Sequence, residues 1–407
     1  MRMHIFRFII VTAFLGMTSA KAAVWQETQS WDSSWEKKYS EWVRNSFNEE
    51  IFVSGPYKDI STDCSDAVYA ARVIFAYEHK LPFVIRDSTG GGSRITNKMS
   101  RFDDISDSLK RVRKFIVFVG QATSTKTLPD DTYPVKINRE YVRAGTVWTR
   151  PRQNAASIID RIVRGGAGQD PGHAELVKSV SDTGVIYLIG STVPKAVRQM
   201  HTTSSLVFMP VETTTGLRNW IPADYYGRSK SSIPGYSLEQ YNTLGSEGGD
   251  SRHIRTWTRD VQKRLALREE SKEESIERQA DDVCGLVNAR VDIVADGEER
   301  RRHLDGACMD QGDYEAYSTP SRDNRIKESL FQIMDAANAK GFTKTQKLKK
   351  LKSYLDRCPD IRISSGRTIS LYEFALQLMK GNVSNNPNHN FEARWGLGRD
   401  ITICRKY

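Results

Sequence analysis

Residues 61–80 have the clearest helical pattern in the chain. Apolar side chains recur there at spacings of three, four and seven residues, as Val68, Ala71 and Phe75 do, so one face of the segment is apolar. Pro82 follows and ends the helix, because proline cannot continue it. The polar residues able to cap the start of this helix are Ser61, Thr62 and Asp63.

Strand patterns follow the helix. Runs rich in β-branched and aromatic residues predict strands at 113–120 and between Tyr133 and Arg150. Residues 172–180 and 184–192 predict a hairpin, because the SDTG that connects them is a good turn. A helix followed by strands indicates an α+β fold.

The rest of the chain divides into three parts. Residues 206–249 are rich in Pro, Gly, Ser and Tyr, and we expect loops that complete a first domain at 23–250. Residues 251–283 are highly charged and predict a helical linker. Residues 284–407 have mostly helical patterns, which predict an α-helical accessory domain with a closing strand after Arg394.

The first 22 residues have the pattern of a secretory signal peptide. Arg2 and Arg7 precede an apolar run of about ten residues, and Ala20 and Ala22 form an A-x-A cleavage site. The run is too short to span a bilayer well, and no later stretch is apolar enough to do so, although a retained anchor stays open. We therefore expect a periplasmic or secreted protein with no integral membrane span after cleavage.

The net charge favours anionic surroundings. The whole chain carries +10, and loss of the three basic residues in 1–22 leaves 57 basic and 50 acidic residues, or +7. Such a charge suits a cell wall or lipid headgroups. The basic residues alternate with acidic ones and accompany no nucleic-acid motif, so we expect no nucleic-acid partner. The oligomeric state has no signature in the sequence.

The five cysteines are an odd number for an exported protein, in which cysteines tend to pair. Cys64 lies 220 positions before the next one. Four cysteines cluster in the last third, and the simplest partition pairs Cys284 with Cys308 and Cys358 with Cys404. Spacing leaves all three connectivities open. Cys64 is then a nucleophile, a disulfide partner or a core residue.

Chemistry at Cys64 is favoured by its place in the predicted helix. A thiolate is stabilised in the first turn by the free N–H groups and the helix dipole, and the same groups can hold an oxyanion. His79 lies about 22 Å along the same helix, too far to serve as its base. His173 opens a predicted strand, which makes it the best candidate for a thiolate–imidazolium pair. No Cys/His cluster has zinc spacing, so we expect no metal or other cofactor.

The segment DCSDAVYAARVIFAYEHKLPF followed by GHAELVKSV and GVIYLIGST resembles papain-like cysteine hydrolases of the NlpC/P60 type. That family carries a D-C-S-G/D motif that opens a helix and a G-H motif that opens a strand. The resemblance covers about 51–200 and implies a Cys helix packed on an antiparallel sheet. It also implies a Cys64/His173 dyad, and Tyr57 matches a tyrosine that precedes the family's cysteine and contacts substrate. Bacterial transglutaminase-like proteins share the Asp-Cys helix and the later histidine strand.

The chain departs from these families at two points. A stretch at 152–170 resembles an insertion before the histidine. A transglutaminase-like site also needs an aspartate at the end of the next strand, where this chain has Gly190, Ser191 and Thr192. Ser191 or Thr192 is a candidate for the third catalytic group. Glu175 is another, because residues two apart share a strand face.

Two acidic residues flank Cys64. Asp63 is predicted to cap the helix rather than act in catalysis. Asp66 lies in the first turn, where it can bind a substrate amine or complement the helix dipole.

Three functions are consistent with the predicted fold, the predicted export and the Cys64/His173 pair. The first is an exported thiol hydrolase that cleaves peptide or amide bonds, with peptidoglycan peptides as the leading substrate. The second is a catalytically inactive binding or scaffold protein with the same fold. The third is a transglutaminase-like acyl transferase that uses the same nucleophile.

Overall fold

The structure is a computed structural model that describes residues 23–87, 94–150, 172–204, 209–245, 254–336, 343–364 and 367–407. The predicted signal peptide and the predicted insertion at 152–170 lie outside these residues. No helix within the described ranges has the length and apolar content needed to cross a bilayer.

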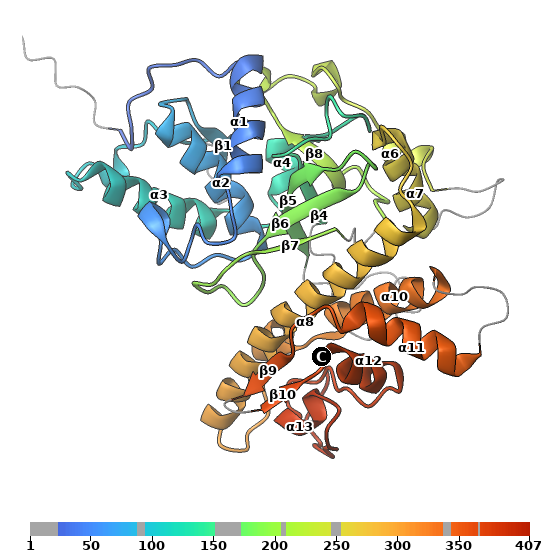
Figure 1. The fold of residues 1–407 in the computed structure, drawn as a ribbon. Helices are drawn as coiled ribbons and strands as arrows, with labels where there is room; N and C mark the ends of the chain where they lie inside the picture. Colours follow the sequence, from blue (N-terminus) through green and yellow to red (C-terminus); the bar gives the residue numbers. More distant parts are fainter. Residues whose placement is uncertain are drawn as a thin grey trace, which may run out of the picture.

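A six-stranded antiparallel sheet forms the centre of the N-terminal part (Figure 1). Its strand order is β3-β8-β4-β5-β6-β7. The hairpin of β5 and β6 is the one expected from the sequence, with Leu176 opposite Ile189 and Val177 opposite Leu188. The strands are β3 (Thr132–Pro134), β4 (Val147–Arg150), β5 (His173–Val180), β6 (Ile186–Gly190), β7 (His201–Thr203) and β8 (Gly216–Trp220).

Helices α1 (Ser33–Asn45) and α2 (Cys64–Glu78) pack on one face of the sheet, and α3 (Ser108–Ala122) packs against α2 (Figure 1). The largest apolar core lies between them and the sheet, and strand residues Ala174, Leu176 and Ile189 belong to it. Burial of such side chains stabilises the fold by about 25 cal/mol per Å² of apolar surface. We call this face the α2 face.

The opposite face of the sheet packs against α7 (Ile254–Leu265). Trp148 of β4 stacks on Trp257 of α7 with their ring centroids 5.6 Å apart. Val177 and Leu188 join the same core. We call this second face the α7 face. Alternate residues of β5 therefore point into two different cores, as strand geometry requires.

The C-terminal part is mainly helical and has its own apolar core around Val287, Leu330 and Phe374. Its elements are α8 (Lys272–His303), α9 (Gln311–Tyr317), α10 (Pro320–Ala336), α11 (Lys344–Leu355), β9 (Ile361–Ser364), β10 (Arg367–Ile369), α12 (Leu371–Met379) and α13 (Phe391–Arg394). The predicted domain boundary at residue 284 falls inside α8, a continuous helix.

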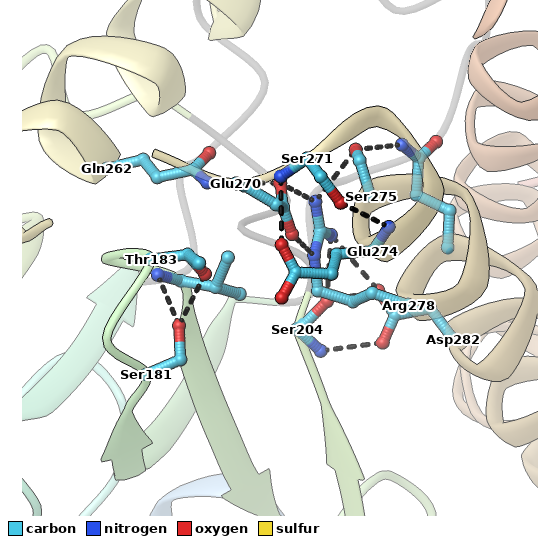
Figure 2. Close-up of polar contacts among 12 residues, drawn as sticks. Ser181, Thr183, Ser204, Gln262, Glu270, Ser271, Glu274, Ser275, Arg278 and Asp282 are labelled. Atoms are coloured by element: carbon cyan, nitrogen blue, oxygen red, sulfur yellow. Dashed lines mark hydrogen bonds and ion pairs between the residues drawn. The ribbon is translucent and has the colours of Figure 1, made fainter. Parts of the chain in front are cut away.

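Polar contacts connect the first turns of α8 with the end of strand β7 (Figure 2). The Ser204 N–H, just after β7, donates to Asp282 at 2.8 Å. Arg278 of α8 donates to Glu270 at 2.8 Å, and Gln262 of α7 donates to the same carboxylate at 3.1 Å. These contacts link α7, α8 and the end of β7, so the two parts of the chain meet along a polar junction.

Short elements complete the described chain. They are η1 (Gly55–Tyr57), β1 (Val84–Arg86), β2 (Arg94–Thr96), η2 (Ser100–Phe102), α4 (Leu128–Asp131), η3 (Ala223–Tyr225), η4 (Lys230–Ser232) and α6 (Glu239–Asn242).

Three secondary-structure predictions were wrong. Residues 113–120 form part of α3, because Val112, Phe115, Ile116 and Val119 recur at helical spacing and are buried together. The predicted loops at 206–249 contain β8, which pairs with both β3 and β4. The tail after Arg394 forms no strand, although all of it is described.

The disulfide partition also needs correction. Cys284 pairs with Cys358 and Cys308 with Cys404, with Cα–Cα distances of 6.0 and 5.5 Å. From Cys284, helix α8 continues to His303, a span of about 29 Å at 1.5 Å per residue. That separates Cys284 from Cys308 by far more than a disulfide allows. Cys64 is the free cysteine, as expected.

Candidate active site

The start of α2 is held by a capping box. Asp63 is the N-cap, and its side chain accepts from the Asp66 N–H at 3.1 Å. Asp66 reciprocates by accepting from the Asp63 N–H at 3.2 Å. The predicted cap role of Asp63 is confirmed. Cys64 is therefore the first helical residue, where N–H groups have no partner within the helix.

The Cys64 thiol is buried and strongly held in its protonated form. Burial raises its pKa to about 12, and the nearby carboxylates of Asp63 and Asp66 add to the effect. The N–H groups of Ala174 and Ser65 lower the pKa but do not offset the burial. The helix start thus brings the thiol against the beginning of β5 without activating it.

His173 is paired with a carboxylate. Its Nε2 lies 2.7 Å from Oε2 of Glu175, whose side chain is fully buried. Burial alone raises the pKa of Glu175, but the facing His173, with Arg325 and His201, outweighs burial and holds the pKa at about 2. Glu175, a candidate from strand alternation, is thus the residue that His173 contacts.

Cys64 and His173 lie on opposite sides of the sheet. Ala174 belongs to the core that includes α2, and its N–H points to the Cys64 thiol. His173 and Glu175 flank Ala174 in β5, so their side chains point to the α7 face. Among the described residues, no hydrogen bond joins the His173 imidazole to Cys64. The expected dyad is not assembled in this arrangement.

The surroundings of Glu175 on the α7 face come from β6, β7 and α10. Gly190 faces Glu175 across the strands, and a Cβ there would lie 2.8 Å from Glu175 Cγ. His201 of β7 is opposite Gly190. Burial lowers the pKa of His201 to about 4, although Glu175 opposes that effect. His201 is consequently neutral at pH 7.

Helix α10 closes over this face with two arginines. Arg322 donates to the hydroxyl of Thr192, and Arg325 donates to the Thr203 hydroxyl at 3.2 Å. Arg198 forms an ion pair with Asp296 of α8 at 3.3 Å. The C-terminal helices thus cover the side of the sheet that bears His173.

Ser191 has a structural role on the α2 face. Its hydroxyl donates to the Thr62 carbonyl at 3.0 Å. In the β5–β6 register Ser191 lies opposite Ala174, so it points away from His173. The expectation that Ser191 orients His173 is corrected by this placement. Thr192 points to the other face, where Arg322 binds it.

Asp66 already holds an amine of the chain itself. The Lys195 ammonium lies 2.8 Å from Asp66 Oδ2. Burial and the neighbouring Asp63 raise the pKa of Asp66, while Lys195 lowers it. The predicted contact with a substrate amine would have to displace Lys195.

Tyr57 lies at the far end of α2. Its hydroxyl donates to Glu78, the last residue of the helix, at 3.0 Å. Cys64 is about 21 Å away along the helix axis. The role of Tyr57 as a substrate contact beside Cys64 is therefore corrected to a packing role.

His201, Arg322 and Arg325 are functional candidates that were not predicted from the sequence. His201 begins β7, a strand that was not predicted either. The two arginines belong to a helix 150 positions after His173, and nothing in their local pattern indicates the contact. His201 could have been found only by recognising the short strand HTT after the hairpin.

The α2 face therefore has the protonated thiol of Cys64. The α7 face has the Glu175–His173 pair, which α10 covers with Arg322 and Arg325. No group of three or more His, Cys, Asp or Glu residues in the described ranges is arranged to hold a metal ion. No protein-family model, curated protein or solved structure matches the chain.

Proposed function

We propose that this chain is an exported binding or scaffold protein whose N-terminal part has a hydrolase-like arrangement but does not catalyse. One observation carries the proposal: the Cys64 thiol and the His173 imidazole point to opposite faces of the sheet, and burial raises the thiol pKa to about 12.

Because its pKa is raised, Cys64 is rarely present as the nucleophilic thiolate. With its pKa raised by burial to about 12, Cys64 is almost entirely a neutral thiol at pH 7. A nearby imidazolium would lower the pKa, but His173 is engaged by Glu175. The groups that do face the thiol include the carboxylates of Asp63 and Asp66, which disfavour a second negative charge.

Export is supported by cysteine usage and the N-terminal sequence. Two disulfides fit an oxidising compartment. Residues 1–22 have the pattern of a signal peptide. The resemblance to NlpC/P60 proteins makes peptidoglycan peptides the leading ligand, bound without being cleaved.

The exported thiol hydrolase is the second candidate. It is favoured by the position of Cys64 at the first residue of a capped helix, with the Ala174 and Ser65 N–H groups directed at the thiol. In this candidate His173 leaves Glu175 and takes the thiol proton. The thiolate then attacks the carbonyl, the amine departs with the proton, and water hydrolyses the thioester.

The two candidates are separated by incubating the chain without residues 1–22 with purified peptidoglycan and an amine donor. Cys64→Ser is the matched control, since it is close in size and removes the thiol. We expect the protein to sediment with peptidoglycan and to release no new amine or peptide, with Cys64→Ser behaving identically. Products that disappear in both Cys64→Ser and His173→Ala would establish the hydrolase. Incorporation of the amine donor would instead establish acyl transfer, and absence of sedimentation would remove peptidoglycan as the ligand.

A further inference from the structure

Helix α11 (Lys344–Leu355) is an unusually basic element of this chain. Its sequence, KTQKLKKLKSYL, contains five lysines and no acidic residue. Lys344, Lys349, Lys350 and Lys352 are exposed, and Lys347 is half-buried. Helix α3 also contains basic residues and no acidic one, but α11 has more of them, and all are lysines.

The apolar side of α11 packs against the core of the C-terminal part. Leu351 and Leu355 are buried in the core of the C-terminal part, with 0% and 1% of their surfaces exposed. The helix cannot turn these residues outward without losing that packing. The exposed side, which bears Lys349, Lys350 and Lys352, is the side left for a partner, and we call it the lysine side.

Ion pairs with carboxylates involve only some of these lysines. Lys352 forms an ion pair with Asp356 at 2.5 Å. In the described part of the chain, no ion pair joins Lys344, Lys347 or Lys349 to a carboxylate. By contrast, arginines of α8 such as Arg278, Arg300 and Arg301 each pair with an acidic side chain.

The lysine side of α11 also bears Gln346 and Ser353, next to Lys349 and Lys350. They occupy positions i, i+3, i+4 and i+7, so they form one continuous stripe along the helix. Two ammonium groups, an amide and a hydroxyl are all able to donate hydrogen bonds to phosphate oxygens.

The choice of lysine favours a membrane surface over a nucleic acid. Lysine acts as a point charge, whereas arginine supplies the bidentate contacts typical of nucleic-acid recognition, and α11 has no arginine. Its one aromatic residue, Tyr354, is half-buried with the core. A surface of anionic headgroups needs only local positive charge, worth about 1 kcal/mol per lysine.

We propose that the lysine side of α11 docks this protein on a membrane surface that exposes anionic phospholipid headgroups. The contact is electrostatic, and the helix remains packed on the C-terminal core while it forms. This inference does not depend on the state of Cys64.

The test uses the chain without residues 1–22 and sedimentation with vesicles. One set contains phosphatidylglycerol and phosphatidylcholine, and the other contains phosphatidylcholine alone. The variant Lys349→Gln/Lys350→Gln/Lys352→Gln removes three charges from the exposed side of α11. The matched control, Lys37→Gln/Lys136→Gln/Lys263→Gln, removes three from exposed positions that are scattered over the N-terminal part.

We expect binding to the anionic vesicles that is lost in high salt, and none to phosphatidylcholine. About fivefold weakening per lysine predicts a loss of about a hundredfold in the α11 variant. The control should bind nearly as the wild type does, and circular dichroism should show that both variants are folded.

Three results would overturn the proposal. One is absence of binding to anionic vesicles at low salt. Another is equal weakening by the two triple variants, which would indicate net charge rather than α11. The third is binding to soluble polyphosphate or DNA through α11 while vesicles fail to bind, which would assign the surface to a different polyanion.

Discussion

At the scale of single residues, the buried carboxylate of Glu175 organises the α7 face of the sheet. It faces His173 at 2.7 Å and also interacts with His201 and Arg325. Fully buried charges are costly unless they are paired, and the carboxylate of Glu175 is paired here with His173 and lies near Arg325. Cys64, on the other face, contributes a packed and protonated thiol.

Glu175→Gln should lower the free energy of unfolding by about 3 kcal/mol at pH 7, because it breaks a buried pair. The pKa of Glu175 is depressed from 4.5 to about 2 in the fold. The pair's contribution is therefore present above pH 4.5 and is lost as the pH falls toward 2. Urea unfolding at several pH values should show the two proteins converging in acid.

The exposed Glu41 of α1 provides the control for this prediction, and Glu41→Gln should change stability by less than about 0.5 kcal/mol. A Glu175→Gln protein that matches the wild type at pH 7, with the same dependence on pH, would show that the ion pair contributes nothing.

The side-chain directions within this region were only partly predictable from the sequence. Alternation along a strand places His173 and Glu175 on one face, and that expectation held. Which face α2 covers depends on tertiary packing, which no local pattern reports. For that reason the sequence analysis placed His173 opposite Cys64, and it placed Ser191 beside His173.

At the scale of elements, the start of α2 and the approach of β5 to β6 determine the geometry around Cys64. The capping box fixes where the helix begins. The missing side chain at Gly190 gives Glu175 room between the strands. Each feature rests on one residue and is testable by one substitution.

Asp63→Ala should destabilise the protein by about 1 kcal/mol, because the Asp66 N–H loses its acceptor. Asp63→Asn should retain most of the stability, since its amide oxygen still accepts that hydrogen bond. The midpoints of urea unfolding measure both effects. Equal losses in the two variants would mean that the charge of Asp63, and not its capping oxygen, is what stabilises α2.

Gly190→Ala should destabilise by about 1–3 kcal/mol, because its Cβ would lie 2.8 Å from Glu175 Cγ. Gly285→Ala in α8 is the matched control, since the nearest atom to its Cβ is 3.8 Å away. That change should be neutral or stabilise by up to about 1 kcal/mol, since alanine favours helices. Thermal unfolding of both variants checks the prediction, and a Gly190→Ala protein as stable as Gly285→Ala would refute it.

Element prediction succeeded where pattern and length agreed. The apolar face and polar start of α2 could be predicted, as could the hairpin of β5 and β6. Residues 113–120 were misassigned because Phe115, Ile116, Val117 and Val119 favour strands, while the helical spacing of the buried ones decides the structure. Strand β8 was missed because GLRNW is short and lies in a segment rich in turn residues.

At the scale of the whole molecule, α8 joins a mixed α+β part to a helical part that contains both disulfides. The junction is polar, with Arg198–Asp296 and Ser204–Asp282 among its contacts. The number of paired cysteines could be anticipated from the sequence. Their connectivity could not, because it depends on where α8 carries Cys284.

Peptide mapping of the unreduced protein should recover Cys284 linked to Cys358 and Cys308 linked to Cys404. Replacing Cys284 and Cys358 together by alanine should destabilise the helical part by about 4 kcal/mol, because the pair closes a loop of 74 residues. Cys64→Ser is the control that leaves both disulfides intact. Recovery of Cys284 linked to Cys308 would contradict the helical path described here.

The central claim is that His173 does not activate Cys64, and the rate of Cys64 alkylation in the folded protein tests it most directly. A thiol with a pKa of about 12 should react slowly from pH 6 to 8, faster as the pH rises, and at the same rate in His173→Ala. Unfolding in urea should make the same cysteine react rapidly. Fast labelling of Cys64 at pH 6 that slows in His173→Ala would contradict the account and establish a working dyad.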